Sequence, residues 1–120
     1  VRSAGLAAVA GRPSHQHAVA LASDAAIDLS RHAASPLSPE AIRDADVIFV
    51  MDVAQLVELA GRFPDARGKA YLLSCLAPSS RLDVRDPVDG DLDVFRTCFA
   101  HIHESVAPIA RVLAEAPPCQ

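Results

Sequence analysis

The sequence Asp46-Val47-Ile48-Phe49-Val50-Met51-Asp52 decides the fold. Its five central residues are apolar without a break, and four of those five are β-branched or aromatic. A strand with one wet face alternates polar and apolar residues, whereas an uninterrupted run is typical of a parallel sheet covered on both faces. Such a run is too short for a helix and long enough for a central strand. The stretch therefore predicts a buried strand in an α/β fold.

The residues that follow this strand have helical spacing. Asp52 is suited to cap a helix over residues 53–61, and Gly61 lies near its expected end. Strand, tight corner and helix make half of a βαβ unit. Ligands of such sheets bind at the carboxyl ends of the strands, so we expect Met51 and Asp52 to face an active site.

The rest of the chain supplies the other elements of a parallel α/β sheet. Before the Asp46–Asp52 strand we expect a short strand over residues 2–6, a helix capped by Ser14 and ending near Asp24, an irregular stretch over 27–32, and a helix from Ser38 to Asp44. After the helix that Asp52 caps, we expect a loop over 63–68 and a second buried strand over 69–74. A long loop then leads to a final helix that starts near Asp91 and bends at Pro108. The order predicts a three-layer α/β fold, a short parallel sheet flanked by helices.

Composition narrows the function classes. The 120 residues suit one domain, and no apolar run is long enough to span a membrane. The net charge of −4 argues against nucleic acid or an anionic membrane as a partner. Three cysteines without a CxxC pattern fit a reducing cytoplasm, where we expect the protein to reside.

Several short motifs occur in an order typical of one family. They are Ser3-Ala4-Gly5, Gly11 with Pro13, the stretch from Ile27 to His32, the Asp46–Asp52 strand, and Asp86-Pro87 with Gly90 before the last helix. In these motifs the chain resembles the low-molecular-weight protein tyrosine phosphatases, particularly the bacterial branch encoded with capsule and exopolysaccharide genes. The resemblance covers essentially the whole chain. It implies phosphotyrosine hydrolysis through a phosphocysteine.

The resemblance also implies roles for three residues. In the family, the aspartate of the Asp-Pro pair, here Asp86, is the general acid that protonates the leaving phenolate and then activates water. That chemistry needs a carboxyl group on a loop that reaches the bridging oxygen. Pro87 restricts Asp86 to extended backbone conformations. Ser3 and His32 match positions that hydrogen-bond to and brace the phosphate loop.

One part of the family pattern is missing. Family members begin with a strand, a Cys-x5-Arg-Ser phosphate loop and a long helix, all ahead of the Ser-Ala-Gly motif, whereas nothing here precedes Val1. We therefore expect residues 1–120 to be a single, N-terminally truncated phosphatase-like domain that lacks its nucleophile and is inactive alone. In the family the missing strand lies between the two that follow it, which predicts self-association through open strand edges.

A second Cys-x5-Arg pattern, Cys75 to Arg81, is a decoy. A phosphate loop needs successive inward N–H groups and a helix N-terminus behind them. Pro78 has no N–H, the loop has no glycine, and residues 82–87 do not start a helix. We interpret Cys75 as a buried cysteine at the end of a strand.

The expected substrate pocket departs from the family. Val88 stands where an aromatic residue commonly walls the pocket, the second wall position is Leu6, and the arginine often found after the histidine is Ser35. Ring stacking on phosphotyrosine would therefore be poor. The expected partner remains a phosphotyrosine-containing protein, a bacterial polysaccharide-export tyrosine kinase being one candidate.

Two other functions remain open. One is a non-catalytic binding or regulatory module of the same fold. The other, ranked lower, is an arsenate reductase, which needs a relay of cysteines that Cys75, Cys98 and Cys119 are too widely spaced to form. We expect no metal and no cofactor. The pairs His15/His17 and His101/His103 do not share a helix face, and the aspartates of residues 83–93 lack a calcium-loop order.

Overall fold

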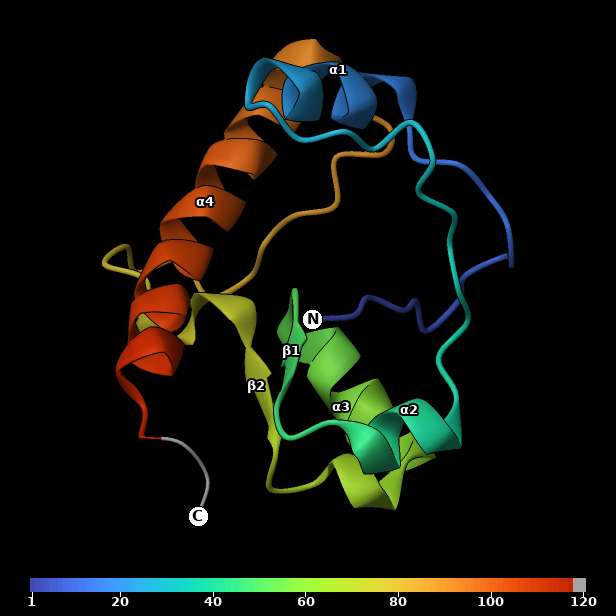
Figure 1. The fold of residues 1–120 in the computed structure, drawn as a ribbon, viewed down its shortest axis with the longest axis vertical. Helices are drawn as coiled ribbons and strands as arrows, with labels where there is room; N and C mark the ends of the chain where they lie inside the picture. Colours follow the sequence, from blue (N-terminus) through green and yellow to red (C-terminus); the bar gives the residue numbers. More distant parts are fainter. Residues whose placement is uncertain (118–120) are drawn as a thin grey trace.

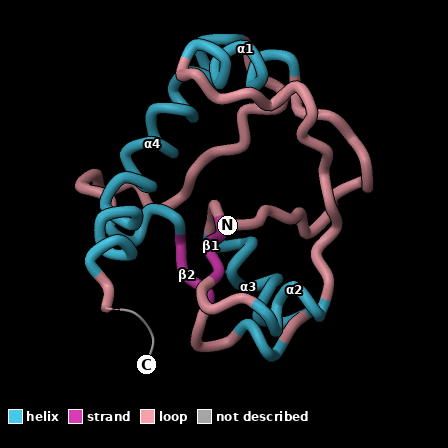
Figure 2. Tube along the Cα trace, viewed as in Figure 1, coloured by secondary structure: helices cyan, strands magenta, loops and turns pink. Residues whose placement is uncertain are grey.

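The computed structural model describes residues 1–117 and has an α/β fold with a short parallel sheet, as the sequence predicts (Figures 1 and 2). In chain order its elements are α1 (Gln16–Asp24), α2 (Pro39–Asp44), β1 (Ile48–Val50), α3 (Val53–Arg62), the 3-10 turn η1 (Pro64–Ala66), β2 (Ala70–Leu72), the 3-10 turn η2 (Leu73–Leu76) and α4 (Leu92–Glu115). Cys119 lies outside the described residues.

The β1–α3–β2 unit forms as expected from the sequence. The two strands are parallel and pair Ile48 with Ala70, Phe49 with Tyr71 and Val50 with Leu72. Asp52 caps α3, because its Oδ1 accepts the backbone N–H of Gln55 at 2.7 Å. The helix starts directly after β1, so its N-terminus lies at the carboxyl end of that strand.

Both faces of β1 are covered, which explains its uninterrupted apolar sequence. Ile48 and Val50 pack in one hydrophobic cluster with α2 and α3, around the fully buried Ile42 and Leu59. Phe49 packs against a second cluster, which includes Ile109 of α4. In Figure 1 the strands lie between α4 on one side and α3 on the other, which gives the three-layer arrangement expected from the sequence.

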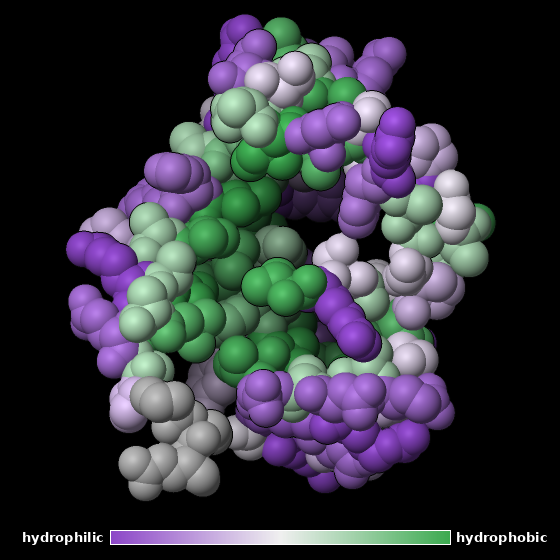
Figure 3. All heavy atoms as spheres, in the orientation of Figure 1, coloured by the Kyte–Doolittle hydropathy of each residue, from purple (hydrophilic) through white to green (hydrophobic). Residues whose placement is uncertain are grey.

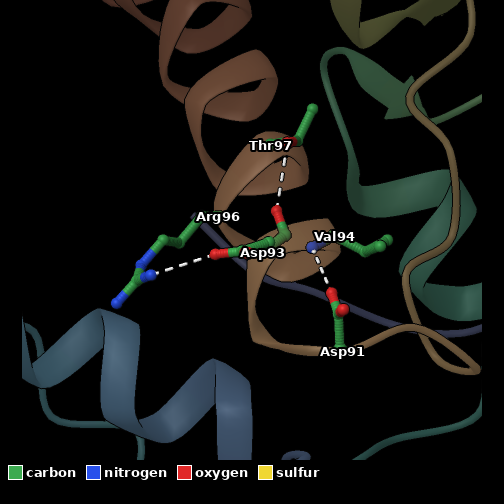
Figure 4. Close-up of polar contacts among 5 residues, drawn as sticks. All are labelled: Asp91, Asp93, Val94, Arg96 and Thr97. Carbon is green, nitrogen blue, oxygen red and sulfur yellow. Dashed lines mark hydrogen bonds and ion pairs between the residues drawn. The ribbon is translucent and has the colours of Figure 1, made fainter.

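The helices α2 and α4 begin where their capping residues predict. Ser38 accepts the N–H of Ala41 at 3.2 Å, and a proline occupies the first turn of α2. At the start of α4, Asp91 accepts the N–H of Val94 at 3.0 Å (Figure 4). Asp93 also pairs with Arg96 at 3.1 Å across one turn. The residues before α4 are therefore tied to a well-capped helix start.

The strand expected over residues 2–6 is wrong. This segment has no ladder in the described structure, and only Gly5 forms an isolated parallel bridge, to Pro36. Its backbone bonds run instead to the loop before α2: the N–H of Gly5 bonds Ser35 O at 2.9 Å, and the N–H of Leu37 bonds Gly5 O at 3.0 Å. A strand needs an extended partner over several residues, and a loop supplies one for a single residue.

The expected Ser14 cap of the first helix is also wrong. The helix starts one residue later than a Ser14 cap implies, and His15 is its N-cap, with Nδ1 accepting the N–H of His17 at 3.1 Å. The imidazoles of both histidines pack on Phe95 of α4, with ring centroids at 4.6 Å for His15 and 5.2 Å for His17. This packing holds the start of α1 against α4.

Two predicted boundaries shift. The second strand ends at Leu72, because the chain then turns into η2, and the loop expected over residues 63–68 contains the single turn η1. The irregular stretch over residues 27–32 is confirmed, with no helix or strand.

Candidate functional site

A cleft opens at the carboxyl end of β1, where Met51 and Asp52 were expected to face a site. Its volume is about 240 Å³, slightly below that of common ligand pockets, which start near about 300 Å³. Hydrophobic residues also gather in the hollowed centre of the face seen in Figure 3. The lining comes from α1, the β1–α3 corner, the loop before α4, and α4 itself: Ala18, Met51, Asp52, Gln55, Val84, Arg85, Asp86, Pro87, Phe95, Cys98, Phe99 and Ile102.

Hydrogen bonds hold the β1–α3 corner that forms one wall of the cleft. The N–H of Met51 bonds Gln55 Oε1 at 2.9 Å, while Asp52 takes the N–H of Gln55. Gln55 and the two corner residues thus bond to one another. The corner is fixed by side chains from the first turn of its own helix.

The loop before α4 joins this corner from a distant part of the sequence. The N–H of Val84 bonds the carbonyl oxygen of Met51 at 2.7 Å, and Asp83 Oδ1 accepts the N–H of Val53 at 3.1 Å. Val84 is 3% exposed and belongs to the second hydrophobic cluster. These contacts bring the Asp86-Pro87 pair to the cleft.

Asp86 lies in the cleft lining and is exposed to solvent. Its Oδ1 accepts the N–H of Val88 at 2.9 Å, a local turn that leaves Oδ2 free for another partner. Cys98 of α4 lines the same cleft. Burial, and then the negative charge of Asp86, raise the pKa of the Cys98 thiol. The Asp86 carboxylate therefore acts electrostatically on the interior of the cleft.

The other four expected site residues do not line this cleft. Ser3 and His32 are exposed, in the loops before α1 and before α2. Leu6 is partly buried against the first hydrophobic cluster, and its carbonyl oxygen accepts a bond from Arg62 Nη1 at 2.9 Å. Val88 is 51% exposed beside the Asp86 turn. Their expected roles remain predictions.

Cys75 lies in η2 and is exposed, so its expected burial is wrong. The turn η2 ends at Leu76, and the chain from Ala77 to Asp91 contains no helix. No helix N-terminus therefore stands behind the Cys75–Arg81 segment. Successive inward N–H groups and a helix dipole, which bind phosphate in such loops, are not assembled there.

Sequence reasoning missed part of the lining. Gln55, Phe95, Cys98 and Phe99 all belong to amphipathic helices, and the sequence indicates for them only a buried face. Among the described residues that line the cleft, the single cation is Arg85, while two lining residues, Asp52 and Asp86, carry carboxylates. The cleft as described suits an acid and an apolar leaving group better than a phosphate dianion.

Two further features bear on function. Among residues 1–117, no group of three or more histidine, cysteine or acidic side chains is arranged to hold a metal ion. Within the same residues, no helix combines the length and hydrophobicity needed to cross a membrane.

An α/β fold with an Asp-Pro loop at the carboxyl end of a central parallel strand is the arrangement that the sequence motifs imply for a phosphatase. The family model described as "Low molecular weight phosphotyrosine protein phosphatase" matches residues 1–117. The chain belongs to this family.

Individual relatives carry two activities in their names. The chain is 33% identical over 106 residues to the probable low molecular weight protein-tyrosine-phosphatase EpsP of Ralstonia nicotianae, covering 88% of this chain and 71% of that protein. It is 30% identical over 113 residues to a protein-arginine-phosphatase of Bacillus subtilis, and the match covers 94% of this chain and 75% of that protein.

Solved structures agree on the fold. A mutant YwlE arginine phosphatase with a phosphorylated active-site serine superposes with a TM-score of 0.88 at 29% identity, covering 95% of this chain and 74% of that one. Vibrio vulnificus Wzb in complex with benzylphosphonate superposes with a TM-score of 0.86 at 27% identity, and the match covers 92% of this chain and 77% of that one.

Proposed function

We propose that residues 1–120 form one phosphatase-like domain in which Asp86 is the general acid for cleaving a phosphate monoester of a protein side chain. The position of Asp86 supports this: it follows a loop bonded to the end of β1 and lines the cleft there. Its exposed carboxyl can exchange protons with solvent and approach a leaving oxygen. In this proposal Ser3 and His32 brace the phosphate loop, and Leu6 and Val88 border the substrate.

We further propose that this polypeptide alone does not hydrolyse phosphotyrosine. The phosphocysteine route needs a cysteine thiolate in an anion-binding loop. Cys75 is exposed, without a helix N-terminus behind it. Cys98 has a raised thiol pKa and two carboxylates in its cleft. Neither cysteine has the surroundings of a low-pKa nucleophile.

Hydrolysis of para-nitrophenyl phosphate by the purified chain tests this second proposal. We expect no turnover, and no phosphocysteine at Cys75 or Cys98 by mass spectrometry of a para-nitrophenyl phosphate reaction quenched with acid, in which a nucleophilic thiolate would displace nitrophenolate and keep the phosphoryl group. Turnover that disappears in Cys75→Ser and persists in Cys98→Ser would overturn the dismissal of the Cys75 loop. Binding of a phosphopeptide without turnover would favour the non-catalytic module.

A second substrate class is supported by two observations. Some relatives are protein-arginine-phosphatases, and the cleft holds the carboxylates of Asp52 and Asp86 without an aromatic residue at position 88. A guanidinium leaving group pairs well with carboxylates and needs no ring stacking. Isothermal titration with phosphotyrosine and phosphoarginine peptides of otherwise identical sequence distinguishes the two: tighter binding of the second would favour phosphoarginine.

The likeness to the EpsP and Wzb phosphatases supports a proposal for the biological setting. We propose a cytoplasmic protein whose partner is a phosphotyrosine-containing protein, a polysaccharide-export tyrosine kinase being the leading candidate. Co-purification with such a kinase, compared with its phosphosite variant, tests this assignment. Equal recovery of both forms would count against it.

A further inference from the structure

We propose that Asp83 is a positioning residue that holds the Asp86 loop over the cleft by capping the first turn of α3. The inference rests on the proposed role of Asp86. It goes beyond that role because Asp83 would act through the loop and not on substrate. No local motif marks Asp83, whose partner Val53 lies 30 positions away in the sequence.

Three successive residues fix the upstream end of the loop to three different places. The Ser74 hydroxyl donates to the carbonyl oxygen of Leu82, Asp83 Oδ1 accepts from Val53 N, and Val84 N donates to Met51 O. We call residues 82–84 the latch. The side chain of Val84 adds an apolar anchor, since it is almost completely buried.

Beyond the latch, the loop is held mainly by its own bonds. In the described structure, Val88 N donates to Asp86 and Gly90 N donates to Pro87 O. The next fixed point is Asp91, which caps α4. Asp86 thus lies in a short loop between the latch and the start of α4. The geometry of the latch therefore determines where the Asp86 carboxyl lies.

An aspartate is well suited to this task. The first N–H groups of a helix lack intrahelical partners, and a negative charge near them is favourable. Asp52 takes the N–H of Gln55, and Asp83 takes the earlier N–H of Val53. The bond to Val53 uses a short side-chain oxygen, which asparagine also provides, alanine does not, and glutamate places one methylene further away.

Cys98 reports the position of Asp86 without any need for enzymatic activity. In a Cys75→Ser/Cys119→Ser background, Cys98 is the single remaining cysteine. The rate of its alkylation by iodoacetamide, measured against pH at low ionic strength, gives the midpoint of thiolate formation. The Asp86→Asn change should shift this midpoint to lower pH, because it removes a charge that disfavours the thiolate.

If Asp83 holds Asp86, then Asp83→Ala shifts the midpoint in the same direction and adds nothing in an Asp86→Asn background. We expect Asp83→Asn to restore the parent midpoint. Asp83→Glu, which keeps the charge, should shift it as alanine does. Asp89→Asn is the matched control: it removes an exposed charge from the same loop, and Asp89 has no hydrogen bond among those of the described residues.

The outcomes separate the two proposals. An unchanged midpoint in Asp86→Asn would show that Asp86 is not held at the cleft, and would overturn both. A shift in Asp86→Asn without one in Asp83→Ala or Asp83→Glu would overturn the latch alone. The latch would also be overturned if Asp83→Ala shifts the Cys98 midpoint by the same amount in the Asp86→Asn background as in the parent. Asp83 would then act on the burial of Cys98 and not through Asp86. If circular dichroism shows Asp83→Ala to be unfolded, Asp83→Glu decides.

Discussion

Phe49 and Val50 are neighbours on β1, yet their side chains belong to different hydrophobic clusters. Val50 packs with α2 and α3, and Phe49 packs with α4. The two clusters therefore share one short strand as their common wall. Loss of packing on either side displaces the carboxyl end of β1, where the cleft and the latch are built.

Truncating the core on the α3 side tests how closely the first cluster is packed. Leu59 is 1% exposed, so Leu59→Ala leaves a cavity and should lower the free energy of unfolding by about 2–5 kcal/mol. Leu56, partly buried in the same helix, is the matched control, and its alanine variant should lose less. Urea unfolding followed by circular dichroism measures both. Equal losses would mean that the first cluster is not close-packed around Leu59.

A stabilising change is expected at the end of α1. Ala26 has a φ of 59°, a left-handed conformation that costs a residue with a Cβ about 1–2 kcal/mol. Glycine avoids this strain but loses more chain entropy on folding, so we expect Ala26→Gly to gain up to about 1 kcal/mol. Ala20→Gly, inside α1, should instead lose about 1 kcal/mol. A fall in melting temperature for both variants would contradict the backbone assignment at Ala26.

The general acid can be tested in a completed enzyme, with a family-type strand, phosphate loop and helix fused ahead of Val1. There, Asp86→Asn should slow phenyl phosphates with basic leaving groups by about 10²–10⁴-fold and those with acidic leaving groups far less. A basic phenolate needs its proton in the transition state, whereas an acidic one departs without it. The measurement is the slope of log rate against leaving-group pKa.

His32 provides the comparison in the same enzyme. If it braces the phosphate loop, His32→Ala lowers all rates by a similar factor and leaves that slope unchanged. If Asp86→Asn also leaves the slope unchanged, Asp86 is not the general acid, and the Asp-Pro pair serves only as a turn.

Self-association is expected from the sheet. In the described structure β1 pairs with β2 alone, so each strand keeps one open edge with free backbone groups. Light scattering after size exclusion should show a dimer that grows with concentration. Val47→Lys places a charge directly before β1 and should weaken the dimer, while Asp65→Lys, an exposed change outside the strands, should not. A monomer at all concentrations would show that the edges are protected.

Local chemistry explains which elements could be predicted from the sequence. The β1 strand, the Ser38-Pro39 helix start, the Asp52 cap and the start of the last helix near Asp91 depend on residues within a few positions of one another. The failures involve distant partners. Residues 2–6 contain no β-branched or aromatic residue, and their neighbour in the fold is a loop. His15 caps α1 while packing on Phe95 of α4.

The site divides in the same way. Met51, Asp52 and Asp86 could be placed at the cleft, the first two from strand polarity and the third from the family motif. Asp83 and Cys98 could not, because the bond of Asp83 to Val53, and the place of Cys98 in the same cleft as Asp86, join segments far apart in the chain. No periodicity within one segment encodes such a contact.

The bonds that tie Gly5 and Gly11 to the loop before α2 have a consequence for local opening of the fold. The chain between Gly11 and Ala34, or between Gly5 and Ser35, is about as long as the chain between the paired strands, so loop entropy hardly separates these contacts. Burial does separate them, because β1 is covered on both faces whereas Gly11 is exposed. Backbone bonds near water open more readily than bonds in a packed core. In native-state hydrogen exchange, the amides of Gly5 and Gly11 would then open before those of Ile48 and Val50.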